Sequence, residues 1–353
     1  MKLSRRNFLK GIAAMGATAF LTTYKSEIVQ ALNEVKDYWH ICWLNGADCG
    51  GCTISFAQAA DPDLVEILTS ITVGNSGLPI ALPDYMEIIH PASGSVAEKL
   101  KEERWKKGSK GRKILIIEGS VQDPGFLTIG GKDFREHLKD AARHADAIIA
   151  FGACACYGGI PSGRPNPTNA RGVQQFLNEE GIDKTVINLP CCPGHPDHLV
   201  LTLASVMLGV IPELDAYGRP KVFFGKNMHE ELCPYRPYYD RGIFATKPGE
   251  EGCRYKLGCK GPVVHTDCAI RKWNNHVSYC VEVGAPCIGC AEPGFPDRFS
   301  PFYKEIPGLP SVLGVDATKL GEGLIAATAA GIAIHAAKRL ASKERYEREE
   351  EEK

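Results

Sequence analysis

Cysteine is the residue type that most constrains how this chain can fold. The 353 residues include 14 cysteines, and most of them stand in short motifs rich in glycine and proline. Cys49 and Cys52 share a Cys-Gly-Gly-Cys turn, Cys154 lies in Gly-Ala-Cys-Ala-Cys-Tyr-Gly-Gly, and Cys191 and Cys192 lie in Leu-Pro-Cys-Cys-Pro-Gly. A metal site, a redox pair or a disulfide framework would each use such thiols. The fold therefore has to be one that brings distant cysteines together.

The first thirty residues predict an export signal rather than a part of the fold. The run Ser-Arg-Arg-Asn-Phe-Leu-Lys over 4–10 precedes a short apolar stretch over 11–21. We predict a twin-arginine signal peptide over 1–31, with Ala31 as one candidate cleavage position, and an exported protein in the periplasm or on the outer face of the cytoplasmic membrane. An amphipathic start helix is the alternative. Because this route carries folded proteins, the cysteines meet reducing cytosol first, and metal ligation competes with disulfides.

Between residues 36 and 210, short apolar runs alternate with helical patterns. Four runs bounded by turn residues predict buried strands, over 39–44, 113–118, 147–151 and 185–189. Phe134, Leu138 and Ala141 recur at helical spacing between two of these runs, and Val173 and Phe176 do so again. Alternation of strands and helices indicates a parallel sheet covered on both faces. We predict an α/β fold whose first domain, 36–210, is a flavodoxin-like, doubly wound parallel sheet.

Three of the predicted strands lead directly into cysteine. Cys49 and Cys52 follow the first, Cys154 and Cys156 the third, and Cys191 and Cys192 the fourth. Ligands of doubly wound sheets bind beyond the carboxyl ends of the strands, so these thiols should converge at one edge. Four thiolates from three strand ends suit a 4Fe–4S cluster. Cysteines left over would be small buried apolar side chains.

Residues 221–310 are poor in regular periodicity and rich in proline, glycine and cysteine. Eight candidate ligands gather there: His229, Cys233, Cys253, Cys259, Cys268, Cys280, Cys287 and Cys290. They divide into two sets of four, and thiolates select iron–sulfur clusters or zinc over hard cations. We predict a loop-rich iron–sulfur domain with little regular structure, stabilised by its clusters. An Ala/Gly-rich helix over 321–340 and a charged, disordered tail over 341–353 should follow.

Composition excludes two other classes of protein. Lys plus Arg number 41 and Asp plus Glu number 42, which gives a formal net charge of −1. The basic excess typical of nucleic-acid-binding proteins is therefore absent, and we expect no nucleic-acid partner. No segment approaches the roughly 20 apolar residues that a membrane-spanning helix needs.

The motifs resemble the small, electron-transferring subunit of nickel–iron hydrogenases, from the export signal to Phe299. The resemblance is carried by residues 43–52, 152–159, 252–262 and 286–293 and by the Cys-Pro pair at 192–193. It implies a proximal 4Fe–4S cluster held by Cys49, Cys52, Cys154 and Cys192. The resemblance, rather than the spacing, selects Cys154 over Cys156 and Cys192 over Cys191.

The resemblance also implies two clusters in the second domain. The distal 4Fe–4S cluster takes His229, Cys233, Cys253 and Cys259, and the medial cluster takes Cys268, Cys287 and Cys290. Many family members have proline where this chain has Cys280, and they hold a three-iron medial cluster. A thiolate at Cys280 supplies the missing ligand, so we predict a medial 4Fe–4S cluster of lower potential. A 3Fe–4S cluster beside a buried free Cys280 is the alternative.

Two further departures from the family pattern concern the other clusters. Three residues separate His229 from Cys233, where the family usually has two. Gly50 and Gly51 stand where oxygen-tolerant relatives with a modified proximal cluster carry an additional cysteine, so an ordinary proximal cluster is expected. A neutral histidine in place of one thiolate should raise the distal potential, which suits the last carrier of a relay.

The implied function is an electron relay. Hydrogen would be split at a nickel–iron centre in a separate large subunit, because this chain lacks the paired CxxC motifs that hold that centre. Electrons would pass through the proximal, medial and distal clusters to a cytochrome or another membrane electron acceptor, and a dimer of heterodimers is one possible assembly. The alternatives are a stand-alone multi-cluster electron carrier and an exported zinc-binding or disulfide-stapled binding protein. The sequence assigns no role to Cys42, Cys156 or Cys191.

Overall fold

The computed structural model describes residues 38–60, 62–67, 81–105, 110–306 and 323–339. The predicted signal peptide, 1–31, and the predicted tail, 341–353, lie outside the described residues. The chain divides into two compact units, Met1–Lys304 and Glu305–Lys353. The first unit contains all fourteen cysteines and includes both the predicted sheet domain and the predicted cluster domain.

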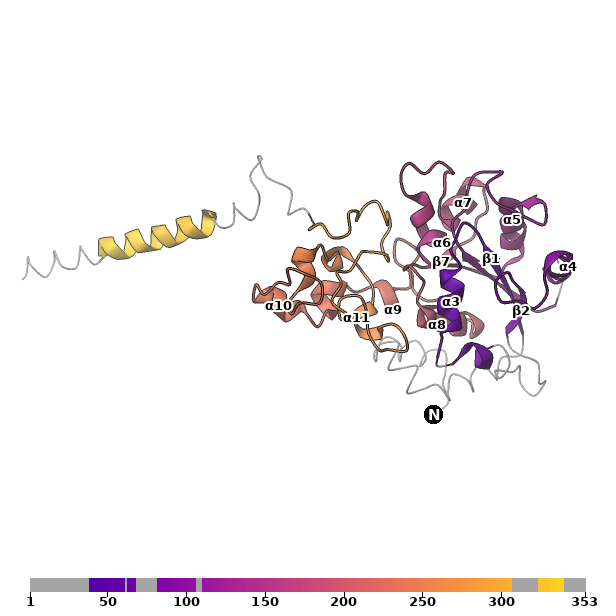
Figure 1. Ribbon diagram of the computed structural model, residues 1–353, viewed down its shortest axis with the longest axis horizontal. Coiled ribbons are helices and arrows are strands. Elements are labelled where there is room, and N and C mark those ends of the chain that lie inside the picture. The colour runs from indigo at the N-terminus through magenta and orange to yellow at the C-terminus, as the bar shows by residue number, and fades with distance from the viewer. Residues whose placement is uncertain (1–37, 61, 68–80, 106–109, 307–322, 340–353) are drawn as a thin grey trace, which may run out of the picture. The chain divides into compact units, whose positions relative to one another are not determined.

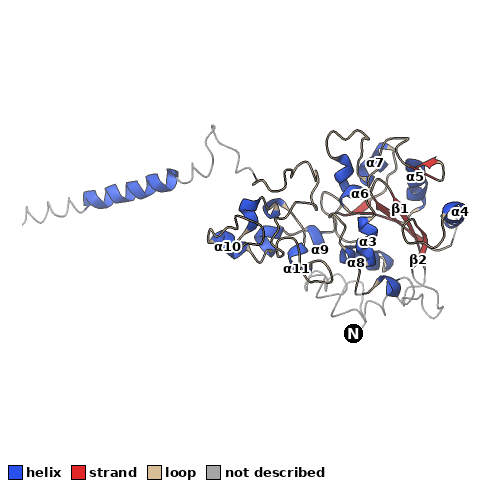
Figure 2. Ribbon diagram, viewed as in Figure 1, coloured by secondary structure: helices blue, strands red, loops and turns tan. Residues whose placement is uncertain are grey.

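A five-stranded parallel sheet forms the centre of the first unit (Figure 2). Its strands are β1 (Trp39–Asn45), β2 (Ala81–Met86), β3 (Arg112–Glu118), β6 (Ala147–Phe151) and β7 (Val186–Leu189). They lie in the order β2-β1-β3-β6-β7, and every neighbouring pair is parallel. This is the strand order of flavodoxin-like sheets. The predicted fold class is confirmed, while β2 was not among the predicted strands.

Successive residues of each strand pack against helices on opposite faces of the sheet. Trp43 and Ile116 pack in one core cluster with α3 (Gly51–Ala57) and α8 (Pro196–Met207). Leu44 and Ile117, the next residues along, pack in the other. The helices on that second face are α4 (Gly94–Arg104), α5 (Phe134–His144), α6 (Ala153–Tyr157) and α7 (Val173–Glu179). The sheet is therefore buried on both sides, as a doubly wound fold requires.

Residues beyond α8 form short helical turns joined by loops (Figure 1). The turns are α9 (Lys221–Phe224), η3 (Met228–Leu232), α10 (Arg236–Asp240), η4 (Arg254–Leu257), η5 (Gly261–Val263) and α11 (Cys268–Arg271). Phe223, Phe224 and Val264 belong to the same core cluster as Trp43 and Ile116. The loop-rich segment is thus anchored on one face of the sheet. A small hairpin, β4 (Thr128–Ile129) and β5 (Lys132–Asp133), and the turn η2 (Ile160–Ser162) complete this unit.

The second unit contains a helix over 323–339 whose side chains are exposed. Leu324, Ile325, Ile332 and Ile334 are each more than half exposed. Across the described part of the chain, no helix combines the length and the apolar character needed to cross a membrane.

Candidate cluster-binding sites

The loop after β1 presents the first two candidate thiols. Asp48 closes this loop, because its Oδ2 accepts a hydrogen bond from the Asn45 side-chain amide at 2.6 Å and its Oδ1 accepts the Gly50 N–H at 3.0 Å. Burial raises the pKa of Asp48 above its ordinary value. Cys49 stands at the tip of this turn, and Cys52 is the second residue of α3.

A buried glutamate at the end of β3 fixes the first turn of α3. Glu118 is 1% exposed. Its Oε1 accepts the Cys52 N–H at 2.9 Å. Its Oε2 accepts the Thr53 N–H at 2.9 Å, the Thr53 hydroxyl at 2.5 Å and the Trp43 indole N–H at 3.3 Å. Burial raises the pKa of Glu118. The backbone of Cys52 is therefore held by a side chain from the neighbouring strand.

Glycines allow the loops after β1, β6 and β7 to meet. A Cβ on Gly152, which has φ +94°, would lie 2.4 Å from Cys52 Sγ, and one on Gly159 would lie 2.7 Å from Cys154 Sγ. Real side chains do not tolerate such contacts. The Gly194 N–H donates a hydrogen bond to Cys52 Sγ at 3.3 Å. The loops after β6 and β7 thus both approach the thiol of Cys52.

Burial disfavours the free thiolate at these positions. It raises the pKa of Cys154 to about 11 and that of Cys192 to about 12, and Cys49 raises both further. Burial also raises the pKa of Cys52 well above its ordinary value, with Cys154 and Cys192 among the charges that add to it. A bound metal reverses this preference, because a coordinating thiol is deprotonated outright. The chemistry of this donor set fits a metal cluster better than four free thiols.

The medial candidates form a second group of thiols. Burial raises the pKa of Cys280 to about 11, and Cys290 and Cys268 raise it further. Burial raises the pKa of Cys287 as well, and the charges of Cys259, Cys290 and Cys268 raise it further. The Thr266 hydroxyl lies 3.2 Å from Cys268 Sγ. Cys280 and Cys287 are therefore both within electrostatic reach of Cys268 and Cys290.

Cys191 lies against this medial group. Its side chain is 0% exposed. Hydrogen bonds to Cys268 and Cys290, followed by burial, hold the pKa of Cys191 well above its ordinary value. The same hydrogen bond from Cys191 lowers the pKa of Cys290.

The distal candidates include a buried histidine with a free ring nitrogen. His229 is 3% exposed, and its Nε2 has no hydrogen-bond partner. Its Nδ1 lies 2.8 Å from Glu230 Oε1, which fixes the orientation of the ring. A Cβ on Gly261 would lie 3.4 Å from His229 Cβ and 3.5 Å from Cys259 Sγ, so the histidine and this cysteine flank the same turn. An orphaned, buried imidazole nitrogen is what a metal ligand requires.

Two cysteines complete the distal group. Cys233 and Cys253 are among the charges that raise the pKa of Cys259 to about 11, after burial. Cys233 Sγ lies 3.6 Å from the Tyr279 hydroxyl. The Cys287 N–H donates to Cys259 Sγ at 3.3 Å, which joins the distal group to the medial one. Cys290 is among the charges that raise the pKa of Cys192, which joins the medial group to the proximal one.

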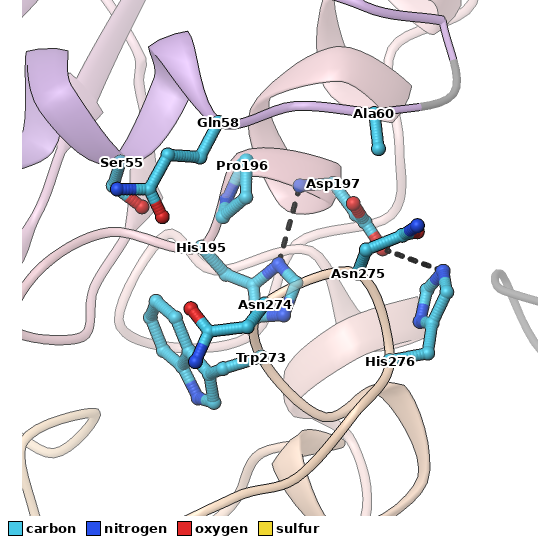
Figure 3. A pocket seen from close by; sticks show the side chains of 10 residues that line it. All are labelled: Ser55, Gln58, Ala60, His195, Pro196, Asp197, Trp273, Asn274, Asn275 and His276. Carbon is cyan, nitrogen blue, oxygen red and sulfur yellow. Dashed lines mark hydrogen bonds and ion pairs between the residues drawn. The ribbon is translucent and has the colours of Figure 1, made fainter.

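A buried histidine fixes the loop that follows α11, at a small pocket between α3, α8 and this loop (Figure 3). His195 Nε2 lies 2.5 Å from the Lys272 carbonyl, and its Nδ1 accepts the Asp197 N–H at 3.2 Å. Its ring centroid lies 4.5 Å from that of Trp273. Burial holds the pKa of His195 well below its ordinary value, so the ring is neutral. This contact orients the segment after Cys268 against the sheet domain.

The cysteines are all free thiols, and each of them lies in the described part of the chain. The disulfide-stapled alternative is therefore wrong. Among the residues that the structure describes, no three His, Cys, Asp or Glu side chains form a group that could hold a single metal ion. A four-iron cluster makes a different demand, because each of its ligands binds a separate iron.

Comparison with known proteins places this arrangement in a family. Residues 224–303 match the model for the C-terminal part of the NiFe/NiFeSe hydrogenase small subunit, and residues 49–206 match "NADH ubiquinone oxidoreductase, 20 Kd subunit". The F420 non-reducing hydrogenase I small subunit of Methanosarcina mazei is 41% identical over 370 aligned residues, which cover 96% of this chain and 94% of the relative. The chain belongs to the nickel–iron hydrogenase small subunits.

Other small subunits agree in sequence and in structure. The quinone-reactive Ni/Fe-hydrogenase small chain of Wolinella succinogenes is 35% identical over 352 residues, covering 95% of each chain. The small subunit in the H2-activated NiFeSe hydrogenase of Desulfomicrobium baculatum superposes with a TM-score of 0.67 at 36% identity, covering 77% of this chain and 100% of that one. The actinobacterial-type NiFe-hydrogenase of Ralstonia eutropha H16 gives a TM-score of 0.70 at 30% identity, covering 84% and 91%.

Family membership confirms several predictions. The chain is the small subunit of a hydrogenase, an oxidoreductase, and such small subunits carry iron–sulfur clusters and pair with a large subunit. Residues 2–22 match the model of the twin-arginine translocation signal. The chain is therefore exported by the twin-arginine route, as the paired arginines predicted.

The structure gives two of the unassigned cysteines ordinary roles. Cys42 is 0% exposed and packs in the core cluster that contains Leu44 and Ile117. Cys156 is also buried, and its thiol donates to the Ala150 carbonyl at 3.3 Å. Both are small core side chains, as expected of free buried cysteines. Cys191 is different, because it contacts candidate ligands.

Sequence reasoning missed Glu118 and the proximity of Cys191 to the medial candidates. One available signal pointed to Glu118: it is an acidic residue that directly follows the apolar run Ile-Leu-Ile-Ile at the carboxyl end of β3. No sequence signal pairs Cys191 with Cys268 and Cys290, since the contact depends on how the second segment packs on the first.

Proposed function

We propose that this small subunit holds three 4Fe–4S clusters and relays electrons through them in a fixed order. The proximal cluster is held by Cys49, Cys52, Cys154 and Cys192, the medial cluster by Cys268, Cys280, Cys287 and Cys290, and the distal cluster by His229, Cys233, Cys253 and Cys259. The observation that carries the proposal is the proximity of the three groups in series. The charge of Cys290 raises the pKa of Cys192, and the Cys287 N–H donates a hydrogen bond to Cys259 Sγ.

Each cluster, when bound, supplies a carrier for one electron at a time. The chain's own residues fix where each carrier sits and how its sulfurs are hydrogen-bonded. The Gly194 N–H bonds Cys52, and the Cys287 N–H bonds Cys259. Such hydrogen bonds, together with burial, set the order of the potentials. The neutral His229 removes one negative charge from the distal set, which raises its potential relative to the others.

The fourth medial ligand in this proposal is Cys280. Its thiol lies close enough to Cys268 and Cys290 for their charges to raise its pKa. This supports a complete four-thiolate set rather than a three-iron cluster with a free cysteine beside it.

The large subunit docks on the proximal face. Cys49 and Cys192 are exposed in the isolated chain. Three large apolar side chains are exposed around them: Ile54 at 56%, Ile88 at 45% and Ile160 at 53%. Each of these isoleucines lies near a candidate proximal ligand or its turn. Ile54 is two residues after Cys52 in α3, and Ile88 Cδ1 would lie 3.2 Å from a Cβ placed on Gly50. The Ile160 N–H donates a hydrogen bond to Cys154. An obligate interface buries apolar surface of this kind.

Electrons leave at the opposite end of the series, near η3 and α10, where His229 lies. The acceptor is a cytochrome or another membrane electron acceptor, in keeping with the export signal and with the quinone-reactive relative. On this proposal, the predicted sheet domain, 36–210, holds the proximal cluster. The predicted cluster domain, 221–310, holds the medial and distal clusters.

Anaerobic purification of the complete enzyme tests the proposal. Three four-iron clusters predict about 12 iron atoms in each small subunit, and a three-iron medial cluster predicts about 11. Electron paramagnetic resonance of the air-free oxidised enzyme should show no 3Fe–4S signal. Co-purification of a larger, nickel-containing chain is expected. A stable iron-containing monomer would favour the stand-alone carrier, and a colourless protein would exclude iron–sulfur clusters altogether.

A further inference from the structure

A buried arginine joins the sheet domain to a loop that carries medial candidates. Arg219 is 3% exposed, and its Nε donates to Asp215 Oδ2 at 2.8 Å. Its Nη1 donates to the Ala291 carbonyl at 3.0 Å and to Glu292 Oε1 at 3.1 Å. Glu292 is itself 3% exposed. Because buried charges are tolerated only when they are paired and hydrogen-bonded in good geometry, this contact defines the positions of both partners closely.

The turn that contains Arg219 is fixed on β7. Asn188 of that strand donates its N–H to the Gly218 carbonyl at 2.8 Å and its side-chain amide to the Tyr217 carbonyl at 2.7 Å. Gly218 has φ +73°, and a Cβ there would lie 3.1 Å from the Asn188 side-chain nitrogen, so this close approach favours glycine. Cys192, a proximal candidate, lies three residues beyond the end of β7. The turn is therefore held against the strand that leads to a proximal ligand.

The groups that Arg219 contacts on its other side belong to the loop of a medial candidate. Ala291 and Glu292 directly follow Cys290. The Glu292 N–H donates to the Gly289 carbonyl at 3.1 Å, which closes a turn around that cysteine. The guanidinium thus holds this turn from outside, through a backbone carbonyl and a carboxylate at once.

Glu292 extends the connection to a second medial candidate. Its Oε1 accepts the His265 N–H at 2.7 Å in addition to the contact with Arg219. His265 lies three residues before Cys268. One ion pair therefore contacts the chain beside two medial ligands, and through the turn on β7 it is connected to the strand of a proximal ligand.

We propose that Arg219 is a positioning residue of the relay, whose ion pair with Glu292 fixes the separation between the proximal and the medial clusters. The inference rests on the proposed function, since it presumes a cluster on each of these two ligand sets. In the step concerned, one electron passes between them, so that the proximal cluster is oxidised by one electron and the medial cluster is reduced by one. Arg219 exchanges neither an electron nor a proton. Because electron transfer slows steeply as two carriers move apart, the separation controls the rate of this step.

Two substitutions in the complete enzyme test the connection. Arg219→Met removes the charge and every donor from a side chain of similar length. Arg219→Lys keeps the positive charge, but one ammonium group does not reproduce the planar, forked donors of a guanidinium. The lysine variant therefore retains the buried charge balance while loosening the contacts with Asp215, Ala291 and Glu292.

Arg171→Met is the matched control, because Arg171 has the same kind of surroundings in another place. It is 7% exposed and forms ion pairs with Asp123 at 2.9 Å and Glu179 at 2.7 Å. Its Nη1 also donates to the Asn169 carbonyl at 2.8 Å. All of these partners lie in the sheet domain, so this variant loses a buried arginine without loosening the connection to the medial loops.

The first readout is the magnetic interaction between the reduced proximal and medial clusters in electron paramagnetic resonance, because this interaction weakens steeply with distance. Arg219→Met should change it, Arg219→Lys should change it less, and Arg171→Met should leave it at the parent value. Iron content should stay at the parent value in each variant, since no ligand is altered.

The second readout separates the relay from the chemistry of hydrogen. Isotope exchange between H2 and water needs only the nickel–iron centre of the large subunit, whereas reduction of an external acceptor needs the relay. Arg219→Met should retain the exchange rate while acceptor reduction falls severalfold. A loss of stability alone would lower both rates together.

An unchanged magnetic interaction in both Arg219 variants overturns the inference, and so does an equal change in Arg171→Met. If Arg219→Met does not assemble with iron, Arg219→Lys decides by the same criterion. The parent enzyme separates the two levels of the argument, because a parent that lacks the proximal or the medial cluster by iron analysis refutes the proposed function itself.

Discussion

Substitution of Gly152 by alanine should empty the proximal site. The new Cβ would lie 2.4 Å from Cys52 Sγ. Ordinary contacts between non-bonded heavy atoms begin near 3.5 Å, so the sulfur has to move by about 1 Å. Cys52 has little room to move, because the Gly194 N–H bonds its sulfur and Glu118 holds its N–H. Overpacking of this kind costs about 1–3 kcal/mol.

The backbone adds a second cost, and a matched control isolates it. Gly152 has φ +94° and Gly125 has φ +88°, but a Cβ on Gly125 would meet nothing within 4 Å. Gly152 also has ψ +158°, a conformation essentially restricted to glycine. Alanine in such a sparsely populated backbone region costs of order 1–3 kcal/mol. Gly152→Ala should therefore destabilise the protein by about 2–6 kcal/mol, whereas Gly125→Ala should carry only the backbone cost of its own positive φ.

The assay is iron analysis and electron paramagnetic resonance of the purified heterodimer, alongside its thermal unfolding. Gly152→Ala should lose the proximal signal, with iron falling from about 12 to about 8 atoms. Gly125→Ala should keep the full iron content. Full iron and an unaltered proximal signal in Gly152→Ala would refute the reasoning, as would an equal loss in both variants.

Three further predictions address the other sites. Cys280→Pro should remove one iron, from about 12 to about 11, and introduce a 3Fe–4S signal in the oxidised enzyme; an unchanged spectrum would show that Cys280 is not a ligand. His229→Cys should retain the distal cluster but lower its midpoint potential, because a thiolate adds a negative charge, whereas His229→Ala should lose iron. Burial, together with the charge of Lys101, holds the pKa of His137 below its ordinary value. The folded state then binds fewer protons than the unfolded state, so the free energy of unfolding falls as pH drops through the ordinary histidine pKa near 6.5. The amide of His137→Gln can replace both ring contacts, with Lys101 and with Ile129. Urea unfolding at pH 7 and at pH 5 should therefore show a smaller pH dependence of stability in this variant.

The sheet could be predicted from sequence because its strands are almost wholly apolar. The predicted strands over 147–151 and 113–118 agree with β6 and β3 to within one residue. β2 was missed because its sequence, Ala-Leu-Pro-Asp-Tyr-Met, contains a proline and an aspartate that argue against a strand. Proline is tolerated there because β2 is an edge strand, and the register with β1 shifts beside Pro83.

The candidate thiols could be named from sequence, but the side chains that hold them could not. A strand that ends in cysteine predicts a thiol at the sheet edge, since chain direction alone fixes that position. The contact of Glu118 with Cys52 spans 66 residues, and that of Gly194 with the same sulfur spans 142. Such pairs follow from the packing of whole elements, which no local pattern encodes.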